Sequence, residues 1–255
     1  MPRRYIAGHW LHHRLWGPLG GPLPPIVLLH HGFGHADGWG GFPERLRAAT
    51  GRTILAYSRL DCGRSDATSE DRPEDFFTSE ADTILPALLE SFGLRQACLY
   101  GHSDGATLAL VMAKRHRHLV EAVIAEAPHV FAEARTIAGV RDMARRFDLD
   151  TAFRRKIARG HQHEARPFQL WQKLWLALDA ANWSIERDVG NLDAPLLLVQ
   201  GDNDPFGSLA HVKMVMARNP TARLKVVRGA GHSIHQTEAS LPSAIATFLD
   251  ALRGI

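Results

Sequence analysis

The chain has 255 residues, of which 45% are hydrophobic and 22% charged, values typical of a globular protein. This composition excludes a disordered chain or a coiled coil, and the length fits one large α/β domain with room for an insertion. The formal net charge is +3. The basic residues are scattered, however, and their one dense run, residues 114–118, falls at the end of an expected helix, where positive charge favours the dipole. We therefore expect no nucleic-acid partner.

The cysteines and the N-terminal residues exclude further classes. Cys62 and Cys98 are too few for a disulfide framework and lack the spacing of a metal site. Residues 1–7 include basic side chains but no apolar signal-peptide core, and no stretch approaches the ~18 apolar residues of a membrane span. We expect a cytoplasmic protein without a membrane partner, whose oligomeric state the sequence does not predict.

Expected strands and helices alternate along most of the chain. Short apolar runs bounded by Gly, Pro or polar residues predict the strands, and 3.6-residue periodicity predicts the helices. The expected strands cover residues 3–16 (one or two strands, divided at Gly8), 26–29, 52–57, 97–100, 119–125, 195–200 and 223–227, and the expected helices cover residues 36–49, 78–92, 107–113, 207–218 and 238–252. This alternation predicts a mostly parallel sheet with right-handed crossovers.

The alternation stops between residues 130 and 190. This stretch is helix-forming and too long for a loop, so we expect a helical cap inserted into a core domain of residues 1–129 and 191–255. An apolar stripe at helical spacing, formed by Trp171, Leu174, Trp175 and Leu178, is expected to pack the cap on the core rather than to contact substrate. His161 and His163 have no carboxylate at ligand spacing, and we expect no metal.

The sequence Gly101-His102-Ser103-Asp104-Gly105 follows the strand at residues 97–100 and precedes a helix. In this context Gly-x-Ser-x-Gly predicts a tight turn that lifts the serine hydroxyl off the sheet and points the helix N-terminus at it. The glycines are needed because side chains two residues from the serine would collide. An ordinary glycine-bearing turn is the alternative interpretation. Ser103 is the candidate nucleophile.

Three further loops follow strands of the expected sheet. His30-His31-Gly32-Phe33-Gly34 lies where serine hydrolases of this topology place an oxyanion donor, which predicts the backbone N–H groups of Phe33 and Asp104 as the pair. An acid, Asp202 or Asp204, and a histidine, His232, follow two late strands. Because loops at the carboxyl ends of parallel strands share one crevice, these residues can meet Ser103. Serine, acid and histidine together suit nucleophilic catalysis.

These motifs, in this order, resemble those of the α/β-hydrolase superfamily over essentially the whole chain. The resemblance implies the α/β-hydrolase fold, a mostly parallel central sheet flanked by helices with a small helical cap. The family's Gly-x-x-Asp pattern selects Asp204 over Asp202, and the preceding Gly231 favours His232 over His235. It also implies catalysis without a cofactor.

Asp104 departs from many relatives, which have Met, Gln or Leu after the nucleophile. The segment Ser103-Asp104-Gly105 is similar to that of biphenyl hydrolase-like (valacyclovirase-like) α-amino-acid ester hydrolases, in which this Asp is understood to hold the substrate ammonium group. The resemblance implies the same substrate-binding role here. The other interpretation is a solvated carboxylate that the helix dipole favours.

The resulting hypothesis is a metal-free serine hydrolase of small carboxylic esters, with α-amino esters as the narrower candidate. A carbon–carbon bond hydrolase of ring-cleavage products uses the same scaffold and triad, although Asp104 disfavours its anionic substrates. Haloperoxidase-like side activity is also compatible, whereas epoxide hydrolases and haloalkane dehalogenases need Asp where Ser103 stands. A non-catalytic receptor-like module on this scaffold is the alternative from another class.

Overall fold

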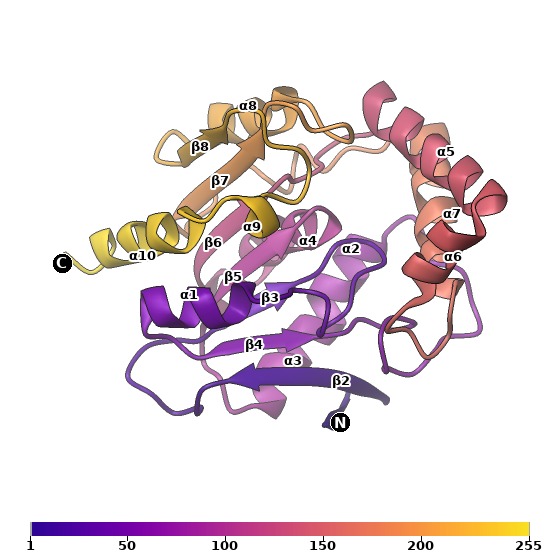
Figure 1. The fold of residues 1–255 in the computed structure, drawn as a ribbon. Helices are drawn as coiled ribbons and strands as arrows, with labels where there is room; N and C mark the ends of the chain where they lie inside the picture. The colour runs from indigo at the N-terminus through magenta and orange to yellow at the C-terminus, as the bar shows by residue number, and fades with distance from the viewer. Residues whose placement is uncertain (1, 255) are drawn as a thin grey trace.

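A computed structural model describes residues 2–254, which form one twisted sheet with helices on both faces (Figure 1). The strand order is β1-β2-β4-β3-β5-β6-β7-β8. The first two strands pair antiparallel, β2 pairs antiparallel with β4, and all further pairs are parallel. The strands are β1 (Arg3–Ile6), β2 (His9–Trp16), β3 (Ile26–Leu29), β4 (Ile54–Tyr57), β5 (Ala97–His102), β6 (Val120–Glu126), β7 (Leu196–Gly201) and β8 (Arg223–Val227).

The strand order reverses its direction between β3 and β5. From β3 the chain moves outward to β4, crosses back over β3 to β5, and then continues through β6, β7 and β8 on the other side. Loops that follow the two central strands therefore diverge and open a crevice at the carboxyl edge of the sheet. The fold places its candidate site between residues 30–34 and Ser103.

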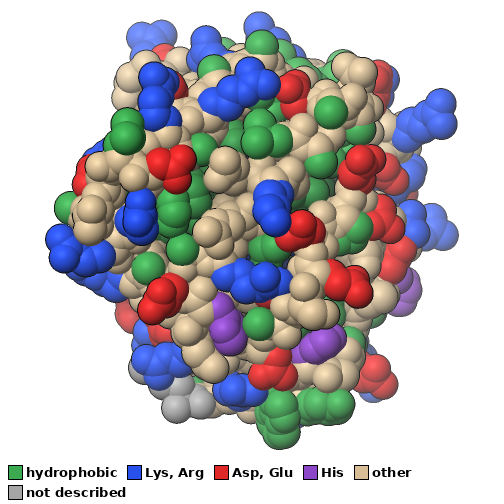
Figure 2. All heavy atoms as spheres, turned by 90° about the vertical axis from the view of Figure 1, so that its right-hand side faces the viewer, with side chains coloured by type: hydrophobic (Ala, Val, Ile, Leu, Met, Phe, Trp, Pro, Cys, Tyr) green, Lys and Arg blue, Asp and Glu red, His purple; other side chains and the backbone are tan. Residues whose placement is uncertain are grey.

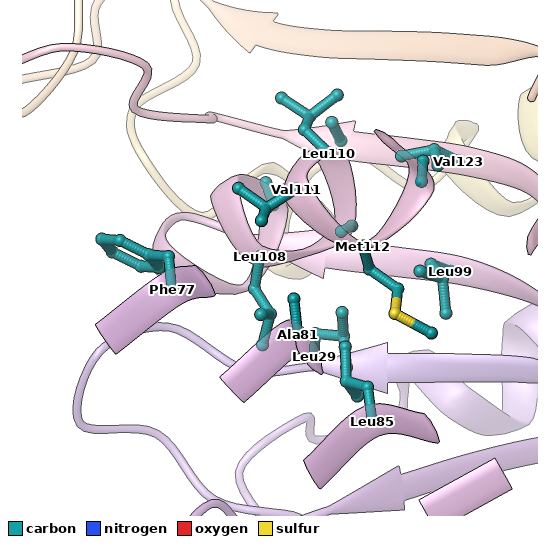
Figure 3. Packing of buried hydrophobic residues seen from close by; sticks show 14 of the residues in the cluster. Leu29, Phe77, Ala81, Leu85, Leu99, Leu108, Leu110, Val111, Met112 and Val123 are labelled. Atoms are coloured by element: carbon teal, nitrogen blue, oxygen red, sulfur yellow. The ribbon is translucent and has the colours of Figure 1, made fainter. Parts of the chain in front are cut away.

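Alternating side chains of the central strands feed two hydrophobic cores. Ile26 and Leu28 pack on the face covered by α1 and α10, and Val27 and Leu29 on the opposite face with α3 and α4. Figure 3 shows side chains of α4 pointing toward those of β3, β5 and α3. The helices are α1 (Phe42–Thr50), α2 (Phe76–Ser79), α3 (Leu85–Ser91), α4 (Asp104–Arg115), α5 (Ala134–Leu149), α6 (Thr151–Ala158), α7 (Arg166–Ala180), α8 (Leu209–Arg218), α9 (Ile234–Thr237) and α10 (Leu241–Ala251).

Three expected helices differ from the observed ones. The helix expected from residue 36 begins only at Phe42, because Gly38, Gly40 and Gly41 favour turns and Pro43 suits a first helical turn. The helix expected over 78–92 begins at Phe76 and contains a π-helical turn, Glu80–Ile84, just before Pro86, which lacks an N–H for a regular helical ladder. The closing helix expected over 238–252 is observed as α10, which begins at Leu241, where Pro242 suits a first helical turn, and a separate short helix, α9, precedes it.

Residues 130–190 contain α5, α6 and α7, which lie together beyond the carboxyl edge of the sheet (Figure 1). The two ends of the segment are paired, since Ala132 N–H donates to Trp183 O at 2.8 Å and Ile185 N–H to Val130 O at 2.9 Å. The apolar stripe on α7 is buried in the core that also contains Phe77 and α4. We propose that this segment is a cap on the core domain.

Figure 2 shows the outer face of the α5–α7 side. Basic and acidic side chains are interspersed there with apolar ones, so this face carries no broad patch of one charge. The run at residues 114–118 spans the end of α4, and its Arg115 and His116 both pair with Asp82. Within residues 2–254, no helix has the length and apolar character that crossing a membrane requires.

Removing the cap is expected to produce an aggregating protein. The pairing of Ala132 with Trp183 allows residues 133–182 to be replaced by two glycines without stretching the chain. The deletion uncovers the apolar surface that the α7 stripe buries, and exposed patches of this kind promote association. Size-exclusion chromatography and ester turnover measure the result. A monomeric deletion variant with full activity would show that the segment is not a cap.

Candidate active site

Ser103 occupies a strained turn between β5 and α4. Its φ of 58° and ψ of −122° lie in a region that non-glycine residues rarely adopt. A Cβ at Gly101 would overlap the backbone of Gly105, and a Cβ at Gly105 would overlap the Leu29 carbonyl. The strand, the turn and the helix therefore approach so closely that only glycines fit on either side of Ser103.

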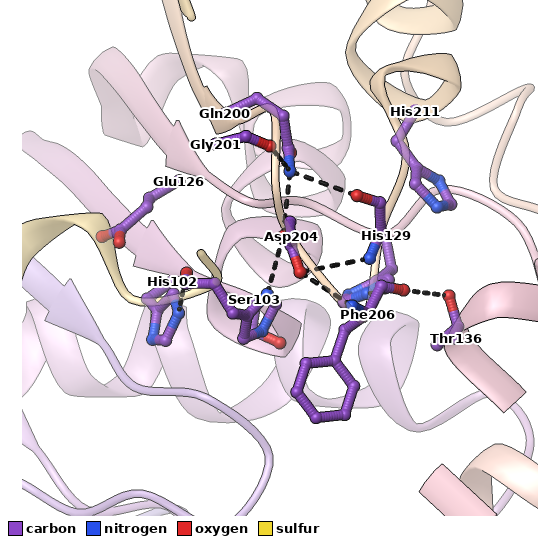
Figure 4. Close-up of polar contacts among 12 residues, drawn as sticks. His102, Ser103, Glu126, His129, Thr136, Gln200, Gly201, Asp204, Phe206 and His211 are labelled. Carbon is purple, nitrogen blue, oxygen red and sulfur yellow. Dashed lines mark hydrogen bonds and ion pairs between the residues drawn. The ribbon is translucent and has the colours of Figure 1, made fainter. Parts of the chain in front are cut away.

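His232 is hydrogen-bonded to Asp204. Its Nδ1 lies 2.8 Å from Asp204 Oδ2, which also accepts from Gln200 Nε2 at 2.9 Å. The other oxygen, Oδ1, accepts from the N–H groups of Phe206 at 2.8 Å and Gly207 at 3.3 Å (Figure 4). Burial raises the pKa of Asp204, but the contact with His232 and these donors outweigh it and lower the pKa to about 2. An ionised Asp204 holds the proton of His232 on Nδ1 and leaves Nε2 as an acceptor.

The neighbouring acid and histidine have other partners. Asp202, in the loop after β7, is exposed, and its carboxylate accepts from the N–H of Gly229, in the loop after β8, at 2.6 Å. His235 is buried, and its Nδ1 lies 2.9 Å from Glu126 Oε2. Of the residues weighed from the sequence, it is Asp204 and His232 that lie against each other.

Ser103 and His232 line one cavity of about 170 Å³. Among the hydrogen bonds of residues 2–254, none joins the Ser103 hydroxyl to His232, a contact that often tightens only when substrate binds. Most of the wall is aromatic or aliphatic. The lining residues are His31, Gly32, Phe33, His102, Ser103, His129, Thr136, Met143, Trp171, Trp175, Phe206, His232 and Ser233.

Two backbone N–H groups have no acceptor among residues 2–254: that of Phe33, which lines this cavity, and that of Asp104, which follows Ser103 of its wall. Asp104 is the first residue of α4, so its N–H has no intrahelical acceptor. For the Phe33 N–H, residues 2–254 offer no acceptor. The ring of Phe33 packs edge-on against Trp171 of α7, with ring centres 4.9 Å apart. Donors of this kind next to a nucleophile suit an oxyanion.

A sequence profile of the alpha/beta hydrolase family matches residues 26–246. The chain belongs to the alpha/beta hydrolase family. A proline iminopeptidase of Lactobacillus helveticus is 34% identical to this hydrolase over 102 residues, which are 40% of this chain and 34% of that protein. The serine hydrolase BPHL of Mus musculus is 22% identical over 199 residues, 72% of this chain and 64% of that protein. The hydrolase thus spans less than two thirds of either relative.

The fold of this hydrolase is similar to that of solved members of the family. The enol-lactonase from Burkholderia xenovorans LB400 superposes with a TM-score of 0.76 at 18% identity, covering 98% of this chain and all of that chain. The family match and this likeness confirm the α/β-hydrolase fold and the hydrolase class predicted from the motifs. BPHL is a distant relative, in keeping with the resemblance seen at the serine.

The carboxylate of Asp104 lies behind the cavity wall of the hydrolase. It is fully buried, and its Oδ1 accepts from Trp175 Nε1 at 3.2 Å. Its Oδ2 has no partner among residues 2–254 and is not part of the cavity lining. Burial raises the pKa of Asp104, and the charges of Arg59 and Arg72 act against that rise. The candidate ammonium ligand therefore already has two cations nearby.

Several residues that line the cavity lie outside every sequence motif, and the sequence did not predict them as site residues. His129, Thr136, Met143 and Phe206 are separated along the chain and meet only in the fold. His129 alone had a signal, since it follows β6 at the edge where the other site loops lie. The apolar stripe of α7 does pack on the core, as expected, but two of its members, Trp171 and Trp175, also form cavity wall.

A buried polar network lies beneath the site. Glu126 accepts from His235 and from the Tyr100 hydroxyl, while His102 Nε2 lies 3.0 Å from the His232 carbonyl oxygen. Despite its burial, His235 and the other partners lower the pKa of Glu126 to about 2. The atoms that His102, Glu126 and His235 could offer to a metal ion lie within 4.8 Å of one another. Hydrogen bonding already accounts for this cluster, and the absence of a metal remains a prediction.

Proposed function

We propose that this hydrolase cleaves small carboxylic esters through an acyl-enzyme on Ser103. The observation that carries the proposal is the strained Ser103 turn facing the same cavity as a histidine held by a buried carboxylate. In this mechanism His232 Nε2 takes the hydroxyl proton as Ser103 attacks the ester carbonyl, and Asp204 stabilises the imidazolium. The N–H groups of Phe33 and Asp104 hold the oxyanion.

The same groups serve both halves of the reaction. The imidazolium of His232 returns its proton to the departing alkoxide, leaving the acyl group on Ser103. Water then attacks this acyl-enzyme with His232 again as base, and the carboxylic acid leaves as Ser103 recovers its proton. No group other than the triad and the two N–H donors is needed.

The cavity supports small, largely apolar substrates. Its volume is about 170 Å³, and Phe33, Met143, Trp171, Trp175 and Phe206 are apolar parts of its wall. None of its lining residues is Lys or Arg, so the wall offers no cation to an anionic substrate. This disfavours carbon–carbon hydrolysis of ring-cleavage products, which carry a carboxylate.

A substrate panel tests the proposed reaction. Aryl and alkyl esters with acyl chains of increasing length are compared with aminoacyl esters and with one ring-cleavage product. We expect kcat/KM to be highest for short-chain neutral or α-amino esters and to fall for longer chains that exceed the cavity. Turnover of the ring-cleavage product with no ester hydrolysis would show that the enzyme is a carbon–carbon bond hydrolase and not an esterase.

The narrower proposal, an α-amino ester, rests on Asp104. Its Oδ2 is buried without a partner among residues 2–254, and a Cβ placed on Gly32, which lines the cavity, would lie 2.7 Å from it. A carboxylate so close to the nucleophile suits a substrate ammonium. Trp175 and the two arginines compete with this role, so Asp104 has to be tested directly.

Asp104→Ala is expected to separate the two functions of this residue. The backbone N–H survives the substitution, so esters without an α-amino group should keep their rates. For α-amino esters kcat/KM should fall about 10- to 150-fold, the range that loss of a charged hydrogen bond gives. The N-acetylated form of the same ester is the control, since it keeps the acyl shape and loses the charge.

Asp104→Asn provides a matched variant, because the amide can still accept from Trp175. If the ammonium site is real, Asn should also impair α-amino esters and spare their N-acetylated forms. Equal losses on amino and N-acetylated esters in both variants would mean that the substitutions only disturb the turn, and the α-amino ester proposal would be abandoned.

A further inference from the structure

We infer that Arg72 is a positioning residue for the oxyanion hole, acting through the peptide bond between Gly32 and Phe33. The inference rests on the proposed ester hydrolysis and extends it to a residue outside every motif. Arg72 Nη1 donates to the Gly32 carbonyl oxygen at 2.9 Å. The N–H of the same peptide bond, on Phe33, is the proposed oxyanion donor.

The geometry of a trans peptide links these two groups. Its C=O and N–H point in opposite directions, and residues 2–254 contain no cis peptide bond. Arg72 therefore holds the carbonyl on one side of the loop, and the Phe33 N–H points to the other. That N–H has no acceptor among the described residues, and Gly32 and Phe33 both line the cavity.

Steric contacts alone do not prevent the Gly32–Phe33 peptide from flipping. Gly32 has no Cβ because one would collide with Trp171, so the backbone before the peptide keeps a glycine's rotational freedom. A reversed peptide would present a carbonyl oxygen where the oxyanion forms and would oppose its charge. A charge-assisted hydrogen bond from Arg72 favours the orientation that the reaction needs.

The preceding peptide is held in the same way. The His31 carbonyl oxygen accepts from Arg59 Nη2 at 2.7 Å, and His30 Nδ1 lies 2.7 Å from it. Arg59 N–H donates to His30 Nε2, which leaves the His30 proton on Nδ1 to donate to that carbonyl. Two guanidinium groups thus hold consecutive carbonyls of the loop, and Arg59 is itself buried.

The same two cations also act on the carboxylate beside the oxyanion hole. Burial raises the pKa of Asp104, and the charges of Arg59 and Arg72 oppose that rise. Arg72 forms no ion pair with a carboxylate among residues 2–254, and its guanidinium lies 4.8 Å from the centre of the Phe76 ring. Its charge is therefore available to the loop that it binds.

Arg72→Met tests the inference, because Met keeps an aliphatic stem against Phe76 and removes both the donor and the charge. Loss of an oxyanion donor costs about 10²–10³ in kcat, and a donor that is only misoriented should cost less, about 10- to 100-fold. We expect kcat on 4-nitrophenyl butyrate to fall by this factor with KM within about threefold. Arg72→Lys, which retains a charge and one donor, should recover part of the rate.

A transition-state analogue and a matched control complete the design. The Ki of a propyl trifluoromethyl ketone, which forms a tetrahedral adduct with Ser103, should rise by the same factor as kcat falls. Arg117→Met removes an exposed arginine paired with Asp193, away from the loop, and should change neither value. Equal Ki and kcat in Arg72→Met and wild type would overturn the inference.

A crystal structure of Arg72→Met separates this inference from the proposed function. If wild-type enzyme neither hydrolyses esters nor binds the ketone, ester hydrolysis is wrong, whatever Arg72 does. The structure of the variant then tests the positioning role. A Gly32–Phe33 peptide that has flipped, or that adopts both orientations, supports this role. An unchanged peptide orientation contradicts it.

Discussion

Ser103→Ala is expected to abolish ester hydrolysis while leaving the thermal unfolding temperature nearly unchanged. The hydroxyl is the group that attacks, and loss of a triad member typically removes several orders of magnitude in rate. The side chain makes no hydrogen bond within residues 2–254 that the fold would miss, and alanine meets the same backbone strain as serine at this φ. Steady-state kinetics on the best ester of the panel and a thermal melt measure both effects.

Ser233 provides the comparison for this substitution, since it is the other serine that lines the cavity. If Ser233→Ala were inactive and Ser103→Ala active, the nucleophile would be Ser233 and the strained turn would have another purpose. Wild-type activity in Ser103→Ala would remove the basis of the proposed mechanism.

Asp204→Asn is expected to lower kcat by about 10⁴-fold, the effect of a histidine held in the wrong tautomer. Oδ1 of Asp204 accepts from two backbone N–H groups, so the amide oxygen of Asn will take that place. The NH₂ group then faces His232 Nδ1 and forces the imidazole proton onto Nε2, where it blocks acceptance of the Ser103 proton. kcat and KM measured separately should show the loss in kcat.

Asp202→Asn is the matched control two residues away. Its carboxylate accepts from the Gly229 N–H in an exposed turn, and an amide oxygen can accept the same bond. We expect kcat within about twofold of wild type, as for surface substitutions away from a site. The reverse pattern, with Asp202→Asn inactive and Asp204→Asn active, would assign the acid to Asp202.

The fold followed from the sequence because its central strands are nearly continuous apolar runs, as parallel strands buried on both faces require. The turn at Ser103 was also readable, since its two glycines stand two residues before and after the serine. Gly101 avoids a collision inside the turn, with Gly105, whereas Gly105 avoids one with the Leu29 carbonyl of the neighbouring strand. Both signals lie within a few residues of the feature that they predict. The start of α1 was misplaced because Trp39 and Phe42 have helical spacing although the glycines between them keep the chain in turns.

The rest of the site depends on contacts between distant parts of the chain. Arg72 and Gly32 are 40 residues apart, and the loop that carries Arg72 has no periodic pattern to place it. Trp175 was assigned to packing from its spacing, which is correct, but its hydrogen bond to Asp104 spans 71 residues. Periodicity predicts which face of a helix is buried. It does not predict which distant polar group a side chain on that face contacts.

Labelling with a fluorophosphonate, followed by mapping of the modified peptide by mass spectrometry, measures directly whether Ser103 is the nucleophile. We expect one phosphonyl group per chain, on the peptide that contains Ser103, and no label on Ser103→Ala. A label on another residue, or an enzyme that hydrolyses esters without being labelled, would contradict this assignment.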